Sequence, residues 1–478
     1  MTDLRTAVTR TAGWSARYPW STLSLWLGGV AVSSTAGALS LKTPVDEVFA
    51  DASGRRMTWY VLAAGGTVML LLIALLAAVV PALVSLLVTL GTVAGAEGWW
   101  AVAARLLPGG RPTASALALV TVLGTALSLT YCLLYLRSER AARRFGAGRA
   151  QPAGTAGGSS RTVLLSSCVT IAVVCGLYVA GDPLLSAVAT GLVLTVAAVM
   201  LASVTVLPAI AARFGRHLAW PKLPVLWRLT YRLGPPRLWS LLLRPGVRRP
   251  GGTLAGSVAL HAVLALPLAW WPREFSGPPA TLLHDTAASD GCGISALNVI
   301  AVAASTVLLA FAALTAVFRS APVALVITIP GALTAVSACG LSAPLLRLWE
   351  PAQALGSRGH GAPAPWAPPL GFVLALAVSG LLLRDAVLRV RAHRAAGMAP
   401  REAAARAVMH TSEGMTVTAV LMCTVFLLGA VLGSPEVGRM CLVLTVSVVL
   451  TVTLVRALTL PSLAVVVAAT RAVPGAAR

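Results

Sequence analysis

Long apolar runs separated by short polar or Pro/Gly-rich stretches recur along almost the whole chain. Each run can cross a bilayer as a helix, which takes about 20 apolar residues. The pattern predicts twelve spans, at roughly 20–41, 59–78, 82–104, 114–136, 161–180, 184–212, 253–271, 296–318, 321–346, 369–388, 413–433 and 438–467. The run 59–104 is divided at Pro81, because proline removes a backbone donor. The predicted fold class is an all-α polytopic membrane protein.

The two halves of the chain repeat one another. One Arg and two Pro recur at the same spacing 252 or 253 residues later: Arg137, Pro183 and Pro208 correspond to Arg389, Pro435 and Pro461. The repeat predicts tandem six-helix halves at 1–212 and 253–470, joined by a linker at 213–252 and followed by a tail at 471–478. Halves in the same orientation place a transport pathway near their interface.

Composition and charge narrow the class of protein. At 57% hydrophobic and 11% charged residues, the chain is far more apolar than soluble proteins, which carry about 25% charged residues. The net charge of +22 falls almost wholly on one predicted side of the membrane. This distribution follows the positive-inside rule with both termini cytoplasmic, and we interpret it as orientation in the membrane rather than nucleic-acid binding. The first apolar run is span-length, so we expect no cleavable signal peptide.

The loops predict little structure outside the membrane. The external segments 42–58 and 272–295 are too short for a domain with its own core, which needs about 40 residues. The Pro/Gly/Ala-rich segment 349–368 is expected to be irregular. The linker 213–252 contains no acid but many Arg and Trp, so it either lies on anionic lipid headgroups or only anchors the topology.

No pattern of catalytic or metal-binding residues stands out. The seven Cys lack metal-ligand spacing, and no Ser-His-Asp set, Walker loop or HExxH motif is found. We therefore predict no enzyme, cofactor or metal site.

Acidic residues are unusually scarce in the predicted spans. Of the 15 Asp and Glu, we place only Asp385 inside a span, near one end. Proton-driven carriers usually need an ionisable carboxylate within the membrane, where such a group is costly and kept for function.

Several stretches resemble the MMPL (mycobacterial membrane protein, large) family of the resistance–nodulation–division superfamily. "AVFRSAPVALVITIPGAL" is similar to that family's turn between spans eight and nine, with Phe318, Arg319 and Ser320 as its hallmark. "VTLVRALTLPSL" is similar to the close of its twelfth span, and "TVLPAIAARFG" to its sixth. The resemblance implies a transporter in the bacterial inner membrane, in a shortened form without large external domains.

In that family, spans four and ten each carry an Asp-Tyr pair understood to relay protons. With Arg137 and Arg389 as anchors, the two Asp positions fall on Leu129 and Leu381. Aligning through Tyr131 moves the first of them to Thr130. The acid expected in span twelve is Thr451. The resemblance therefore implies the family's fold without its relay acids.

Other polar residues in the spans remain open to two interpretations. Arg384 and Asp385 form either a displaced ionisable site or a pair at headgroup level. Arg456, in the last span, has a structural role or contacts substrate or headgroups, with Thr451, Thr453 or a backbone carbonyl as expected partners. His261 is a structural residue or a proton carrier. Thr130 and Tyr131 either line a polar site or join helices.

Two functions follow. The first is an MMPL-like carrier of a lipid or another hydrophobic molecule, with membrane lipids as its partners. The second is a non-transporting paralogue that acts as a scaffold for a larger transporter or a lipid-synthesis complex. The sequence leaves the substrate, the direction of transport and the oligomeric state open.

Overall fold

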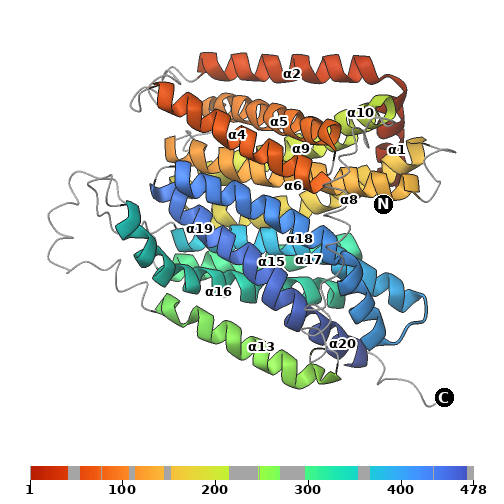
Figure 1. Ribbon diagram of the computed structural model, residues 1–478, viewed down its shortest axis with the longest axis vertical. Coiled ribbons are helices and arrows are strands. Elements are labelled where there is room, and N and C mark those ends of the chain that lie inside the picture. The colour runs from red at the N-terminus through yellow and green to blue at the C-terminus, as the bar shows by residue number, and fades with distance from the viewer. Residues whose placement is uncertain are drawn as a thin grey trace, which may run out of the picture. The chain divides into compact units, whose positions relative to one another are not determined.

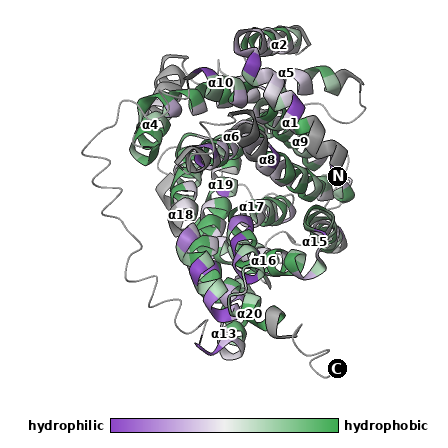
Figure 2. Cartoon of the chain, turned by 90° about the vertical axis from the view of Figure 1, so that its right-hand side faces the viewer, coloured by the Kyte–Doolittle hydropathy of each residue, from purple (hydrophilic) through white to green (hydrophobic). Residues whose placement is uncertain are grey.

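The computed structural model describes residues 2–40, 54–76, 78–106, 114–144, 152–214, 246, 248–269, 296–353, 367–433 and 435–470. Every element in these ranges is a helix, which confirms the predicted all-α class (Figure 1). Hydrophobic residues dominate most of the helices, as a bilayer requires (Figure 2). The predicted external loops, most of the 213–252 linker and the 471–478 tail lie outside the described residues.

Ten helices in the described ranges are long and apolar enough to cross a membrane. They coincide with the third to twelfth predicted spans. The first two predicted spans are also helical, as α2 (Pro19–Ser40) and α4 (Gly54–Leu76). However, α2 is not among the ten, and α4 contributes only the shorter apolar helix Ala64–Leu76. Ser, Thr and Gly make up much of α2, and they lower its hydropathy.

The chain divides into two compact units, Met1–Ile171 with Ser186–Leu233 and Ala172–Leu185 with Gly234–Arg478. The helices of the first unit, beside α2 and α4, are α1 (Thr2–Arg17), α5 (Val79–Leu106), α6 (Ala114–Arg144), most of α8 (Pro152–Val174), α9 (Pro183–Val204) and α10 (Val206–Phe214). Pro81 is the third residue of α5, where its missing N–H costs nothing because the first turn of a helix has no acceptor for it.

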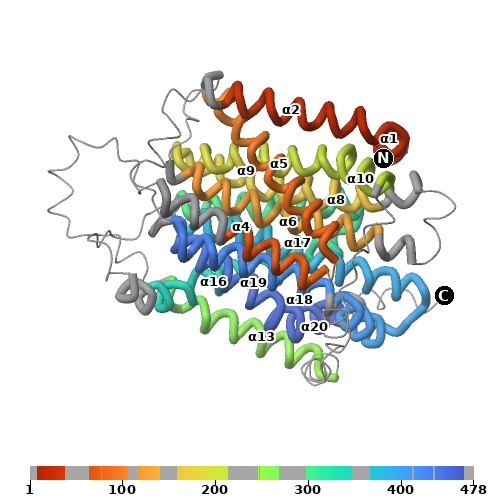
Figure 3. Tube along the Cα trace, turned by 45° about the horizontal axis from the view of Figure 1, so that its top comes forward, coloured from red at the N-terminus to blue at the C-terminus, as the bar shows by residue number. Residues whose placement is uncertain are grey.

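Small residues bring α2 and α5 together in the first unit (Figure 3). A Cβ added to Gly37 would lie 2.7 Å from Gly98 Cα, so glycine is needed where the two backbones cross. The helix α1 packs on α10 and buries Val8 and Ala12, while Trp14 and Tyr18 stay exposed. This arrangement is typical of an amphipathic helix at a membrane surface.

The second unit contains the short 3-10 helix η1 (Cys175–Ala180) and the second half of the chain. Its further elements are α13 (Pro250–Ala265), η3 (Leu266–Ala269), α15 (Ala296–Phe318), α16 (Ala321–Gln353), α17 (Ala367–Ala395), α18 (Pro400–Leu432), α19 (Pro435–Leu450), η4 (Thr451–Thr459) and α20 (Leu460–Thr470). Of these, α17 is the most deeply buried span. In its most apolar stretch of 18 residues, 83% of the residues are buried. Such a helix is shielded from lipid and can carry polar groups at low cost.

Candidate functional site

The last span of the second unit changes its helix type in the middle. Between α19 and α20, residues Thr451–Thr459 form a π-helix, and the N–H of Leu460 donates to the carbonyl of Val455, five residues back. Pro461 follows directly and has no N–H to continue an α-helical ladder. Because π-turns are rare and are frequent at functional sites, this segment is the starting point for a candidate site.

Arg456 lies in the middle of this π-helix with none of its side chain exposed. Its Nη1 donates to Oγ1 of Thr416 on α18, at 3.3 Å. Two of the partners expected from the sequence bond to carbonyls of their own helix: Thr451 to that of Ser447, and Thr453 to that of Val449. A buried guanidinium needs hydrogen-bond acceptors, so Thr416 holds Arg456 inside the helix bundle.

Two hydroxyl pairs tie the ends of the π-helix to neighbouring helices. Oγ1 of Thr451 lies 2.9 Å from Oγ of Ser379 on α17, and Oγ1 of Thr459 lies 2.5 Å from Oγ of Ser257 on α13. All four side chains are buried. The π-helix therefore presents hydroxyl groups at both ends and a cation between them.

His261 adjoins this polar set one turn along α13. Its Nδ1 lies 2.7 Å from the carbonyl of Ser257, and Oγ of Ser337 on α16 donates to the His261 carbonyl at 3.1 Å. A carbonyl only accepts, so Nδ1 carries the proton and Nε2 is left as an acceptor. Within the described ranges, the buried Nε2 has no hydrogen-bond partner. Nε2 of the imidazole is thus ready to accept a hydrogen bond.

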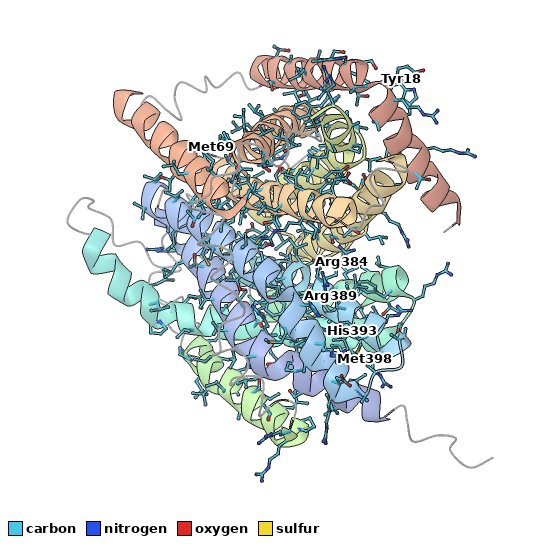
Figure 4. All side chains as sticks on the ribbon, turned by 45° about the vertical axis from the view of Figure 1, so that its right-hand side comes forward. Tyr18, Met69, Arg384, Arg389, His393 and Met398 are labelled. Atoms are coloured by element: carbon cyan, nitrogen blue, oxygen red, sulfur yellow. The ribbon has the colours of Figure 1, made fainter. Side chains whose placement is uncertain are left out.

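The charged residues of α17 follow one another along the helix (Figure 4). Arg384 is 5% exposed, whereas Asp385 is half-buried and Arg389 is exposed. Asp385 lies inside the candidate span Ala367–Ala395, as predicted. Leu381, one turn before Asp385, is also half-buried.

The turn between α15 and α16 contains the Phe318, Arg319 and Ser320 motif. Arg319 adopts a left-handed conformation (φ 50°), and Ser320 accepts the first hydrogen bond of α16 from the N–H of Ala324. The guanidinium of Arg391 donates to the Phe318 carbonyl at 3.1 Å. The motif therefore builds a tight corner that α17 holds in place.

The predicted polar residues of the first unit mainly join helices. The hydroxyl of Tyr131 lies 2.7 Å from Oγ1 of Thr170 on α8, and Thr130 bonds to the carbonyl of Ala126 on its own helix. Leu129 is fully buried, and Arg137 is half-buried at the end of the span. These contacts are the interhelical type that hydroxyl groups make in membranes.

Glu97 is the functional candidate that the sequence analysis missed. It lies inside the candidate span Val79–Ala104, so the prediction that only Asp385 falls within a span is wrong. Oε1 of Glu97 lies 2.5 Å from Oγ1 of Thr121 on α6, within hydrogen-bonding distance. The carboxyl group is tolerated because a hydroxyl on the next helix satisfies it. The sequence held one signal, an acid within a run whose apolar character continues to Leu106.

The described part of the chain holds no group of three or more His, Cys, Asp or Glu that could bind a metal ion. What the second unit offers is an apolar helix bundle with hydroxyl groups, an imidazole and guanidinium groups inside it. Such a set can bind and orient polar groups of a ligand by hydrogen bonds.

Comparison with known proteins supports the sequence resemblance. The MMPL family model matches residues 34–253. The mycolic acid-containing lipids exporter MmpL11 of Mycolicibacterium smegmatis is 32% identical over 149 residues, which are 31% of this chain and 16% of that protein. The heme uptake protein MmpL11 of Mycobacterium tuberculosis is also 32% identical over 149 residues, or 15% of its length. The matched segments therefore span only a small part of these relatives.

Solved structures extend the likeness to most of the fold. SecDF in its super-membrane-facing form matches with a TM-score of 0.55 at 15% identity, over 88% of this chain and 62% of that one. SecDF from Thermus thermophilus, a translocon-associated membrane protein, matches with a TM-score of 0.52 over 87% and 62% of the two chains. At this identity the likeness concerns the fold alone.

Proposed function

We propose that this chain, whose residues 34–253 match the MMPL family, moves a lipid or another hydrophobic molecule across the bacterial inner membrane. The family match and the exporter among the relatives already indicate a transporter-type membrane protein. The positive-inside distribution of charge supports cytoplasmic termini.

The observation that carries this proposal is the polar interior of the second unit's helix bundle. Ser379, Thr451 and Arg456 form a buried polar face between helices whose other faces are apolar. An amphipathic substrate needs both environments, because its acyl part stays in contact with apolar helix faces while its polar part needs hydrogen-bond donors. Arg456 supplies donors for an anionic or neutral polar group.

A transfer assay tests this function. The full chain is reconstituted into vesicles, and the movement of a fluorescent phospholipid between leaflets is followed by its accessibility to a membrane-impermeant reductant. We expect faster movement than in protein-free vesicles, and slower movement with Arg456→Met than with wild type. Equal rates in wild-type and protein-free vesicles would refute lipid transport for this probe class.

One observation favours a second candidate, a scaffold for a larger transporter or a lipid-synthesis complex. Leucine stands at 129 and 381, and threonine at 451, where the family's carriers use acids. Purification in mild detergent should then recover a larger partner in fixed proportion, and Leu129→Asp should create no transport. Recovery of the chain alone, together with lipid movement in vesicles, would eliminate the scaffold.

A further inference from the structure

Glu97 lies well inside the membrane-spanning part of α5. It is seven residues from Ala104, the end of the candidate span Val79–Ala104, and seven residues of α-helix cover about 10 Å. The span is about 39 Å long, whereas the hydrocarbon core is about 30 Å thick. A centred helix would therefore place Glu97 roughly 6 Å below the hydrocarbon boundary.

The Glu97 side chain reaches the surface that lipid would cover. Glu97 is half-buried, and its partner Thr121 is exposed. Trp99, two residues after Glu97, is 57% exposed. Leu90, two helical turns before Glu97, is exposed to the same extent. A carboxyl group on this apolar surface has few neighbours that can stabilise a negative charge.

Counting protons at Thr121 identifies the form of the acid. Oγ1 of Thr121 lies 2.5 Å from Oε1 of Glu97 and 2.8 Å from the carbonyl oxygen of Leu117. A hydroxyl has one proton, so it cannot donate fully to both oxygens. If Glu97 is protonated, its O–H donates to Thr121 while Thr121 donates to Leu117, and both hydrogen bonds are complete. If Glu97 is ionised, one of the two contacts lacks a proton.

No described side chain offers Glu97 a counter-charge. The helices that pack most extensively on α5 are α2, α4 and α6, and Trp100 of α5 also meets Gly191 of α9, a helix without charged residues. Neither α2 nor the part of α4 with described side chains, from Ala64 to Leu76, contains a charged residue. On α6 the nearest described charges are Arg137 and Glu139, 16 and 18 residues beyond Thr121, which is about 24–27 Å along the helix.

We propose that Glu97 and Thr121 form a proton-binding site on the lipid-facing side of α5 and α6. The carboxylate of Glu97 takes a proton from water at the near membrane surface and becomes a carboxylic acid, whose O–H bonds to Thr121. Release returns the proton to water and leaves the carboxylate partly uncompensated. The protonated, uncharged form of Glu97 is the one that can lie in the hydrocarbon. Protonation of Glu97 and its contact with lipid are therefore coupled.

This site gives the proposed transporter a protonatable acid outside the family's relay positions. A role of Glu97 in driving transport rests on the proposed function, whereas proton binding by Glu97 does not. Glu97 precedes Gly98, which packs closely on Gly37 of α2. A change in charge at Glu97 therefore acts at a crossing where the helices have little freedom to adjust.

Infrared spectroscopy of the full chain in phospholipid vesicles tests the site directly. At neutral pH we expect the C=O stretch of a protonated carboxylic acid, lost in Glu97→Gln and moved to higher frequency in Thr121→Val, which removes the hydrogen bond. Thr424→Val is the control, since Thr424 is a half-buried threonine of another span and bonds only to its own helix at the Val420 carbonyl. Asp385→Asn controls for another acid within a candidate span. Both controls should leave the band unchanged.

Labelling with dicyclohexylcarbodiimide gives a second, independent readout, because this apolar reagent attacks protonated carboxyl groups from the lipid. Peptide mass spectrometry should find the adduct on Glu97 at neutral pH, with less adduct at alkaline pH. Identical neutral-pH spectra for wild type and Glu97→Gln, or no adduct on Glu97, would overturn the site. An unshifted band in Thr121→Val would overturn the pairing. If the band behaves as expected but no lipid moves in vesicles, the proposed function fails and the proton site stands.

Discussion

The last spans of the two halves, α9–α10 and α19–η4–α20, share a proline and differ in what surrounds it. In the first, the helix is interrupted only at Thr205, ahead of Pro208. In the second, nine residues ahead of Pro461 adopt π-helical geometry and bury Arg456. The repeated proline thus accounts for a break in both spans. The longer distortion and the buried cation belong to the second span alone, which points to the second unit as the place for polar ligands.

The contacts that bridge the two breaks also differ. Near the first, Oγ of Ser160 on α8 donates to the backbone carbonyl of Ser203 at 2.7 Å. At the second, the hydroxyls of Ser257 and Thr459 bond to each other. A hydroxyl can rotate to other acceptors, whereas a carbonyl depends on the donors that reach it. The first break is therefore expected to be the more rigid of the two.

The largest effect is expected from removing the acceptor of Arg456. Thr416→Val leaves the buried guanidinium with one acceptor fewer, which should lower the free energy of unfolding by about 1.5–3 kcal/mol, as for hydrogen bonds to charged groups. Arg456→Met should cost less, because replacing a buried charge with an apolar side chain is often neutral. Unfolding in mixed detergent micelles measures both. A Thr416→Val variant as stable as the Thr424→Val control would contradict the role of Thr416.

The next effect concerns the first break. Ser160→Ala removes the donor to the Ser203 carbonyl and should cost about 1–2 kcal/mol, because a buried acceptor loses a partner. The same unfolding measurement applies, with Ser167→Ala for comparison, since Ser167 is a buried serine of α8 that bonds to the Val163 carbonyl of its own helix. If Ser160→Ala lowers the free energy of unfolding by less than Ser257→Ala does, the first break is not the more rigid of the two.

Removing a hydroxyl at the second break should have a smaller effect. Ser257→Ala and Ser379→Ala each lose one interhelical hydroxyl pair, and such bonds in membranes are worth about 0.6 kcal/mol. Thr459 and Thr451 can still bond to carbonyls of their own helix. If either variant loses more than about 2 kcal/mol, the pairs are structural anchors rather than adaptable ligand groups.

The smallest effect is expected at Asp385. The side chain is half-buried, and none of the described residues forms a hydrogen bond or ion pair with it that would be lost. Asp385→Asn should therefore change the free energy of unfolding by less than about 0.5 kcal/mol, as for ordinary surface substitutions. A larger loss, measured under the same conditions, would show that Asp385 belongs to the buried polar set.

Much of the fold could be predicted because bilayer thickness imposes a length on each apolar run. Ten of the predicted spans are helices of the right length and hydropathy, and Pro81 lies at the start of α5. The amphipathic α1 was not predicted, because its apolar positions, such as Val8 and Ala12, are few and are satisfied only by packing on α10.

The site was harder to predict because it depends on contacts between helices. Arg456 could be singled out as a buried cation, but its partner Thr416 lies on a different helix, 40 residues earlier. Glu97 was not singled out, although it falls within the predicted span 82–104, because the sequence does not reveal the hydroxyl of Thr121 beside it. The hydroxyl partners of Thr451 and Thr459 lie on α17 and α13, and local sequence does not specify them.

Transfer of a fluorescent phospholipid by the purified chain in vesicles tests the central claim most directly. We expect lipid movement well above that of protein-free vesicles, and loss of most of this increase in Arg456→Met, which removes the buried cation but keeps the fold. Movement no faster than in protein-free vesicles, with folded wild-type protein confirmed in the same sample, would contradict the claim that this chain transports lipid.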